Sequence, residues 1–304
     1  MIVKNVLSQG YPFVEAVASA LPICDEFLIS DGYSTDGTFE ILQKMVGLNK
    51  KIQVFRQEWP TEKRVSVLAE VTNWLRGKCK YDYLFSIQAN EVVHEENIDF
   101  MKALPEMCPM VETFGLPFLH VMGNFKFSEE YRLRLARNLP SIIAVGDAWS
   151  LGTSKEFVRS EALKGLRHPR TLFQYVGRGI QWTYANTCGN PRSRGIYTPK
   201  PIFRYWSLFP QNFLEKCAKH KEMFGLNYTQ TIIDLQKHVN DDPFVFWKLA
   251  IEPFRNGPLG FRYPEGLGEI QIDSHPKVMQ NLILDKKSKQ YSVRAEALDL
   301  IAKG

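Results

Sequence analysis

Apolar and polar positions along the first part of the chain predict strands and helices in turn. Three apolar runs have the length of buried strands: residues 27–29, 51–55 and 83–87. Apolar side chains recur at helical spacing in the stretches beside them: residues 12–21, 39–45 and 61–78. This order of elements predicts an α/β fold, a Rossmann-related mixed sheet flanked by helices.

Further along, strands give way to helices. Residues 113–121 form an apolar run that Pro117 assigns to a bulge or a sheet edge. The alternation in 129–135 places Arg132 and Arg134 on one face of a strand. Two more strands are expected at 142–149 and 202–206, followed by helices over 213–238, 244–251 and 282–302. We expect an α/β domain over 1–210 and a mainly helical extension over 211–304.

Composition and charge narrow the class of protein. The 304 residues include 38 basic and 33 acidic side chains, and a net charge of +5 is too mild to indicate a nucleic-acid-binding protein. This small excess of basic over acidic side chains suits a phosphate-bearing substrate or, at most, peripheral contact with an anionic membrane. The five cysteines lack metal-binding spacing and are expected to be reduced thiols. Without a signal peptide or a long apolar run, the expected location is the cytoplasm.

The first stretch with candidate chemistry runs from Asp25 to Thr38. An apolar strand ends at Asp31-Gly32, and Ser34, Thr35 and Asp36 then offer oxygens that can cap a helix. Ligands of open α/β sheets bind outside the carboxyl ends of strands, which is where Asp31 is expected. The alternative is that Asp31 and Asp36 only build the turn and the cap.

This stretch resembles the signature of the family 2 glycosyltransferases, Asp-Glu, an apolar run, then Asp-Asp-Gly-Ser-Thr-Asp-Gly-Thr. Asp31 and the run 34–38 match, whereas Gly32 and Tyr33 depart from it. The resemblance implies a GT-A-like fold, with Asp31 holding the base of a nucleotide sugar and Tyr33 beside it. It also implies that Lys63 and Arg64, at the start of the helix over 61–78, contact the base or phosphates; a solvated basic helix start is the alternative.

A second motif, Gln88-Ala89-Asn90-Glu91, follows the strand at 83–87. The family commonly has Asp-x-Asp here, which holds a divalent cation against the donor diphosphate. Gln88 and Asn90 are neutral amides of similar shape, and only Glu91 stays acidic, so binding of Mn²⁺ or Mg²⁺ is expected to be weak. Three alternatives follow: a metal-independent transferase, a weak metal user in which Glu91 holds the ion, or an inactive relative.

Two other positions complete the expected site. Arg204 stands where the family commonly has a metal-binding His, and a guanidinium cannot ligate a cation but can neutralise a leaving diphosphate. Asp147 ends the apolar run at 142–149 and is the first candidate for the general base, ahead of Glu129 and Glu130; capping of the next segment is the alternative.

The resemblance implies transfer of a sugar from a UDP- or other nucleotide-sugar donor to a hydroxyl, with inversion. The acceptor would be a glycan, a lipid-linked molecule or a small molecule. A catalytically silent protein that binds a sugar nucleotide or a glycan is the alternative. Arginines and aromatics gathered in 167–204 suit sugar and phosphate contacts, and a nucleic-acid partner is not expected.

Overall fold

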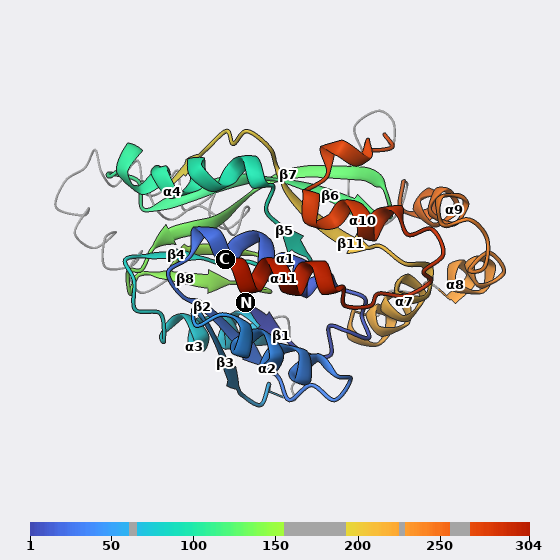
Figure 1. The fold of residues 1–304 in the computed structure, drawn as a ribbon, viewed down its shortest axis with the longest axis horizontal. Coiled ribbons are helices and arrows are strands. Elements are labelled where there is room, and N and C mark those ends of the chain that lie inside the picture. Colours follow the sequence, from blue (N-terminus) through green and yellow to red (C-terminus); the bar gives the residue numbers. More distant parts are fainter. Residues whose placement is uncertain (61–65, 155–192, 225–228, 256–267) are drawn as a thin grey trace, which may run out of the picture.

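The computed structural model describes residues 1–60, 66–154, 193–224, 229–255 and 268–304 (Figure 1). Its first sheet has three parallel strands in the order β1-β2-β3. The strands are β1 (Ile2–Val3), β2 (Phe27–Asp31) and β3 (Ile52–Arg56), and the helices near them are α1 (Phe13–Ala20), α2 (Thr38–Leu48) and α3 (Ser66–Arg76). All five residues of β2 are buried, which explains its continuous apolar run. The α/β class predicted from the sequence is confirmed.

The second sheet is mixed and has six strands. Its order is β4-β7-β6-β11-β5, and β10 pairs with β6 beside β11. The strands are β4 (Tyr83–Phe85), β5 (Glu91–Val92), β6 (Thr113–Met122), β7 (Phe125–Arg137), β10 (Ser193–Gly195) and β11 (Ile202–Ser207). A two-stranded antiparallel sheet, β8 (Ile142–Val145) with β9 (Ser150–Thr153), packs against β7 and α3.

Pro117 lies in the middle of β6 and not at the sheet edge. One side of β6 pairs with β7 along its length, but the other side is shared by two shorter strands. β10 reaches Gly115, and β11 begins opposite Phe118. Pro117 occupies the gap between them, where the sheet needs no N–H donor.

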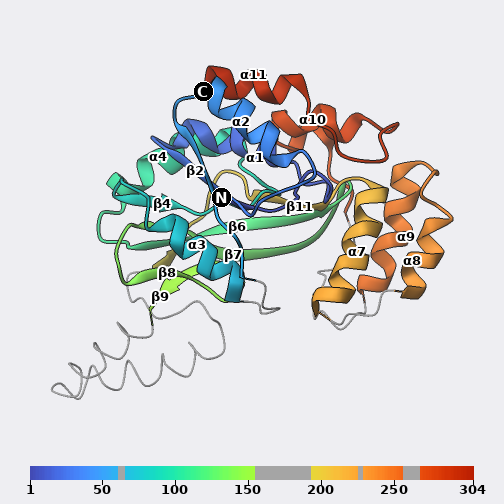
Figure 2. The same cartoon turned by 90° about the horizontal axis from the view of Figure 1, so that it is seen from below.

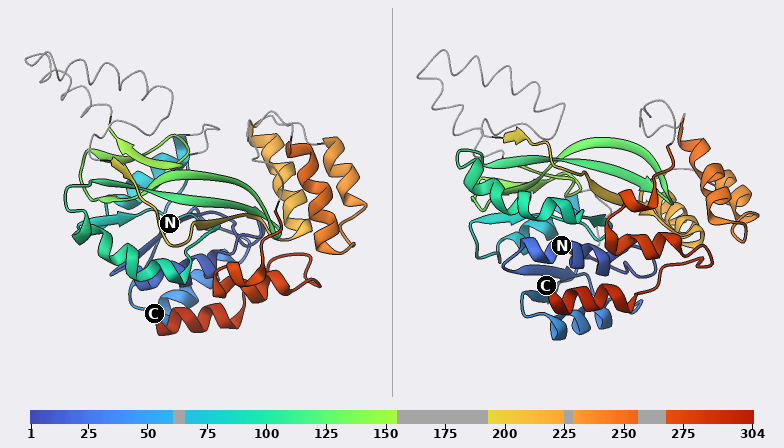
Figure 3. Two further views of the ribbon diagram at one scale, coloured as in Figure 1. Left: turned by 90° about the horizontal axis from the view of Figure 1, so that it is seen from above. Right: turned by 45° about the horizontal axis from the view of Figure 1, so that its top comes forward.

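The helices that follow β11 form two groups. The first stands at one end of the long β6–β7 hairpin (Figure 3) and consists of α7 (Pro210–Phe224), α8 (Thr229–Gln236) and α9 (Pro243–Arg255). Phe213, Phe246 and Trp247 pack there against Phe125 and neighbouring apolar side chains of the hairpin. Gly123 has φ +59°, and a Cβ there would lie 2.1 Å from the Trp247 ring, so only glycine allows this close approach.

The second group consists of α10 (Lys277–Leu284) and α11 (Ala295–Lys303). Figure 2 shows α11 lying over α1 and beside α2, and the Asn49 side chain donates a hydrogen bond to the Ile301 carbonyl. The single helix predicted over 282–302 is therefore wrong: residues 285–294 separate two shorter helices. Between β5 and β6 the chain forms a 3-10 turn at Glu95–Asn97 and then α4 (Ile98–Met107). None of the described helices is both long and apolar enough to cross a membrane.

Candidate functional site

The predicted turn after β2 is built around Asp31. Its carboxylate is fully buried and accepts hydrogen bonds from the Ser34 N–H at 3.1 Å and from Nε of Arg56 at 3.1 Å. A carboxylate can accept about four hydrogen bonds, so acceptor capacity remains on Asp31. Asp36 accepts from the N–H and hydroxyl of Thr38 at the start of α2, which is the capping role expected of it.

The loop that follows β1 is bonded to this turn. The Asn5 N–H donates to the Ser34 hydroxyl, and the Asn5 side-chain oxygen accepts from the Thr35 N–H, each at 2.8 Å. The Ser8 N–H donates to Asp36, also at 2.8 Å. Asn5 and Tyr33 both have positive φ, 52° and 55°. Two such residues in facing turns indicate a backbone held in an uncommon conformation, which is frequent at ligand sites.

Aromatic side chains surround the Asp31–Arg56 pair. The Arg56 guanidinium lies 4.4 Å from the Tyr33 ring centroid and 4.0 Å from that of Phe39. Tyr33 is about half exposed, at 47%, and so offers a free ring face to a ligand. The base-binding role predicted for Asp31 and Tyr33 is compatible with this geometry and stays a prediction.

Gly32 has a structural reason for departing from the Asp-Asp-Gly pattern. A Cβ at Gly32 would lie 2.7 Å from Nε1 of Trp59, so the indole occupies the space that a side chain would need. The Trp59 Nε1–H is buried and has no hydrogen-bond partner among the described residues. An unpaired buried donor next to Asp31 is the kind of group that a ligand carbonyl can satisfy.

The second predicted turn, at Gln88–Glu91, is tied to β11 and β7. Asn90 is buried, and its side chain donates to the Tyr205 carbonyl at 3.1 Å. Glu91 is fully buried; it accepts from Nη2 of Arg134 at 2.5 Å and from the Gln88 N–H at 2.8 Å. Two of the three side chains that the sequence assigned to the donor diphosphate or a metal, Asn90 and Glu91, therefore have protein partners. Among the described residues, no group of three or more His, Cys, Asp or Glu side chains is placed to hold a metal ion.

Most of the charged side chains near the Gln88–Glu91 turn lie on one face of the second sheet. Arg204 on β11 is in register with Glu91 on β5 and with His120 on β6, and His120 is in register with Ser128 on β7. Partners in register share a face, and alternate residues from Ser128 to Arg132 do so as well. A bulge at Arg134 interrupts the alternation, and Arg134 joins the set through its bond to Glu91. We call the resulting set the arginine-rich face: Glu91, His120, Glu130, Arg132, Arg134 and Arg204.

The ion pairs of the arginine-rich face are short, and all their side chains except that of the partly exposed Glu130 are buried. Glu130 accepts from Nε of Arg132 at 2.6 Å and also contacts Nε2 of His120. Although burial opposes ionisation, hydrogen bonds from His120 and the charge of Arg132 hold the pKa of Glu130 at about 2. Burial, followed by the charges of Arg204 and Arg134, lowers the pKa of Arg132 to about 9.

The turn between β8 and β9 covers part of this face. The Ala148 carbonyl accepts from Nη1 of Arg134 at 3.0 Å, and the Trp149 ring lies 3.4 Å from the Arg132 guanidinium. Asp147 precedes them in the turn and is partly exposed. Burial lowers the pKa of Arg134, and the neighbouring charges of Glu91 and Asp147 oppose this effect. Asp147 therefore lies near Arg134, and its role as general base stays a prediction.

Lys216 on α7 links the arginine-rich face to the loop after β1. Its Nζ donates to the Trp206 carbonyl at 2.5 Å and lies 4.9 Å from the Tyr11 ring centroid. Burial, and then the charge of Arg204, lower the pKa of Lys216 to about 7. The same loop holds the Asp31 turn through Asn5.

Some predicted residues lie outside the described part of the chain, and others were missed. Lys63 and Arg64 fall in 61–65, and most of the aromatic and basic run at 167–204 falls in 155–192, so their roles stay predictions. The sequence assigned no site role to Arg132, Arg134 or Lys216. Alternation in 129–135 did predict the two arginines on one face of a strand, but the register of β11 that brings Arg204 beside them has no local signal.

Comparison with known proteins gives only a remote similarity. No protein-family model matches the chain, and no curated protein was found to match it. Among solved structures, residues 1–349 of TarS from S. aureus match at 12% identity with a TM-score of 0.37, covering 99% of this chain and 87% of that one. The same TarS segment in complex with UDP gives 12% and 0.38, and a longer TarS structure, of which 54% is covered, gives 13% and 0.37. Similarity at this level assigns no function, which has to be argued from the chain's own residues.

Proposed function

We propose that this protein is a glycosyltransferase that moves a sugar from a nucleotide-sugar donor to an acceptor hydroxyl with inversion. The observation that carries the proposal is the Asp31 carboxylate at the end of β2, which keeps acceptor capacity and lies beside the half-exposed Tyr33 ring. The second strand-end turn, Gln88–Glu91, lies beside Arg204, which is in register with Glu91. A base at the first turn and a diphosphate at the second would place the donor at the carboxyl ends of β2 and β4.

In this proposal Asp31 accepts a ring N–H of the base, and Tyr33 supplies an aromatic surface. Lys63 and Arg64 are proposed to contact the same nucleotide. Gln88 and Asn90 lie at the diphosphate, and Arg204 provides positive charge there. Asp147 takes the proton of the acceptor hydroxyl while that oxygen bonds to the anomeric carbon. The bond from that carbon to the phosphate oxygen breaks, and the nucleoside diphosphate leaves with the electron pair. A single in-line displacement of this kind inverts the anomeric centre.

The residues of the second turn fit a metal ion poorly. Glu91 is the only carboxylate in the motif, and it is already bonded to Arg134 and the Gln88 N–H. A Mn²⁺ or Mg²⁺ ion would need several free oxygen ligands, and the remaining ones here are amides. We therefore propose that donor binding does not depend on a divalent cation.

The test is a donor screen by thermal shift, starting with UDP-sugars because UDP was bound in one TarS structure, and repeated with excess chelator and with added Mn²⁺ or Mg²⁺. At least one nucleotide sugar is expected to raise the melting temperature equally in all three conditions. Asp147→Asn is expected to keep that shift and to lower transfer or donor hydrolysis by ~10²–10⁴-fold. If no nucleotide sugar stabilises the protein, the proposal is refuted.

The second candidate is a silent binder on the same fold. It is favoured by the structural use of Asn90 and Glu91, whose side chains hold β11 and β7 together. The donor would raise the melting temperature of such a protein, but the protein would neither hydrolyse nor transfer the sugar over a long incubation. Asp147→Asn would then change neither the melting temperature with donor nor the absence of turnover.

A further inference from the structure

The arginine-rich face carries more positive than negative charge. Three guanidinium groups, on Arg132, Arg134 and Arg204, face two carboxylates, on Glu91 and Glu130. Glu91 pairs with Arg134, and Glu130 pairs with Arg132. The partly exposed Asp147 is a third carboxylate near Arg134. Arg204 makes no ion pair with any described residue, and Lys216, whose pKa is lowered to about 7 by burial and by the charge of Arg204, carries only part of a positive charge near neutral pH. A partly buried guanidinium without a carboxylate partner is costly unless an anion binds to it.

Hydrogen-bond donors on the same groups are also unsatisfied. Nη1 of Arg132, Nε of Arg134 and Nε of Arg204 are each buried and have no partner among the described residues. The side chains of Arg132 and Arg134 are each only 1% exposed, so water is not a ready substitute. Unpaired buried N–H groups are rare in folded proteins, and three on neighbouring guanidinium groups point to a ligand that accepts hydrogen bonds.

The placement of the three arginines indicates the kind of ligand. Arg132 and Arg134 are two residues apart on β7, with a bulge at Arg134, which has no partner on β6. Arg204 lies on β11, two strands from β7 with β6 between them, which is roughly 10 Å across the sheet. Arginine side chains are long enough to converge on one ligand, and two linked phosphate groups offer more acceptor oxygens than a single carboxylate does. Planar guanidinium forks match phosphate oxygens, which can bind them in pairs.

We propose that Arg132, Arg134 and Arg204 form a binding site for a diphosphate group, and that these cations take the place of a divalent metal ion. The proposal rests on the proposed function in one respect: the diphosphate is that of the nucleotide-sugar donor and of the nucleoside diphosphate product. The chemistry shared by all candidate ligands is pyrophosphate, so inorganic pyrophosphate is the first probe.

Arg204 is the residue to change, because its removal leaves no carboxylate unpaired. Arg204→Met keeps the length and the apolar stem of the side chain. Wild-type protein is expected to bind pyrophosphate and UDP in the presence of chelator, and Arg204→Met to weaken both by about 10- to 100-fold. Without ligand, the variant is expected to melt at the same temperature as wild type or higher, since a repelling cation has been removed.

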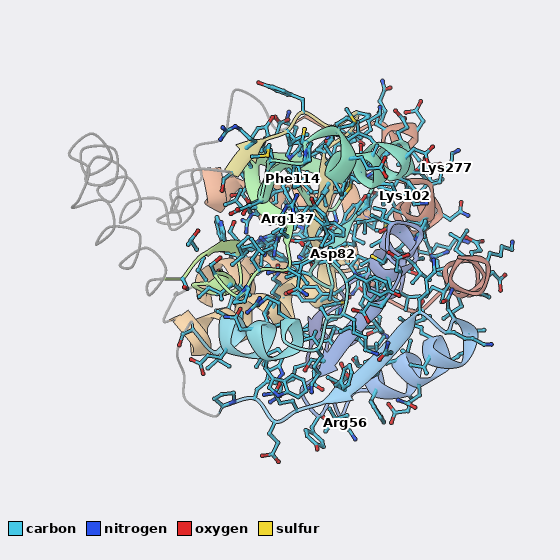
Figure 4. The ribbon with its side chains drawn as sticks, turned by 90° about the vertical axis from the view of Figure 1, so that its left-hand side faces the viewer. Arg56, Asp82, Lys102, Phe114, Arg137 and Lys277 are labelled. Carbon is cyan, nitrogen blue, oxygen red and sulfur yellow. The ribbon has the colours of Figure 1, made fainter. Side chains whose placement is uncertain are left out.

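Arg137→Met is the matched control. Arg137 lies on the same strand, β7, where it pairs with Tyr83 of β4; Figure 4 shows it between Phe114 and Asp82. This control is expected to bind pyrophosphate and UDP as wild type does. UMP, which has one phosphate, is expected to lose less affinity than UDP in Arg204→Met, since the variant removes a contact to the second phosphate group.

The outcomes separate this proposal from the proposed function. Equal binding of pyrophosphate by wild type and Arg204→Met overturns the diphosphate site. Binding of a nucleotide sugar only with Mn²⁺ or Mg²⁺, unaffected by Arg204→Met, also overturns it and leaves a metal-dependent transferase standing. A third outcome is that pyrophosphate binding is lost in Arg204→Met and that no nucleotide sugar binds wild type more tightly than pyrophosphate does. This outcome supports the diphosphate site and refutes the proposed function.

Discussion

Replacing Arg134 by Met is expected to reveal how strongly the buried pair with Glu91 determines stability. Glu91 is 0% and the Arg134 side chain 1% exposed, and their closest N–O distance is 2.5 Å. Loss of the guanidinium leaves a buried carboxylate with the Gln88 N–H as its remaining partner. Breaking one side of a buried pair costs about 3–5 kcal/mol. We expect the lower end, because Arg134→Met also removes repulsion with Arg132 and Arg204.

Urea denaturation of four proteins measures this: wild type, Arg134→Met, Glu91→Gln and the double variant. Glu91→Gln removes the negative charge and keeps an acceptor for the Gln88 N–H, so the double variant is expected to recover at least half of the loss. Arg294→Met is the matched control, since its pair with Asp285 is 25% and 31% exposed and worth about 0–1 kcal/mol. A loss below about 1 kcal/mol in Arg134→Met, or no recovery in the double variant, would refute the reasoning.

Three further changes test other features. Burial raises the pKa of Glu15 to about 7 in the folded protein, and its charged form lacks a partner at Oε1. Wild type therefore loses stability as pH rises from 4.5 to 7, whereas Glu15→Gln does not titrate. Urea titrations at each pH are expected to show the variant gaining up to about 3 kcal/mol relative to wild type over this range. Burial lowers the pKa of His275 to about 4, so up to about 3 kcal/mol of stability that is present above pH 6.5 is lost as pH falls from 6.5 to 4. His275→Phe is expected not to show this loss of stability on acidification. A variant with the same dependence of stability on pH as wild type would contradict the assignment. Gly32→Ala is expected to cost about 1–3 kcal/mol by calorimetry, because the new methyl group displaces Trp59, and an unchanged melting temperature would show that the indole moves freely.

Local signals predicted the parts of the fold that local interactions determine. The apolar run before Asp31 and the capping residues after it are sufficient to define β2 and the start of α2, and both are confirmed. Alternation in 129–135 predicted a strand, and β7 includes these residues; a bulge at Arg134 interrupts the alternation, although Arg132 and Arg134 are both buried. In each case the deciding interactions lie within a few residues of one another.

Pairing between distant segments could not be predicted in the same way. The register that sets Arg204 opposite Glu91 joins residues more than a hundred positions apart, and neither side chain signals the other. Glu91 was predicted to be a weak metal ligand because nothing near it in the sequence signals its pair with Arg134, which lies on another strand. Pro117 was assigned to a bulge or an edge because the gap between β10 and β11 depends on two later segments.

The position of β11 inside the second sheet has a consequence for the order of synthesis. β6 ends at Met122 and β5 ends at Val92, yet the strand that joins them begins only at Ile202, about 80 residues after β6. At roughly 5–20 residues per second, a ribosome takes roughly 4–16 s to supply it. During that interval the nascent chain carries two open strand edges, one of them apolar, of the kind that aggregate. A fragment that stops before Ile202 keeps those edges permanently, so expression of residues 1–200 is expected to give insoluble protein or protein held by chaperones.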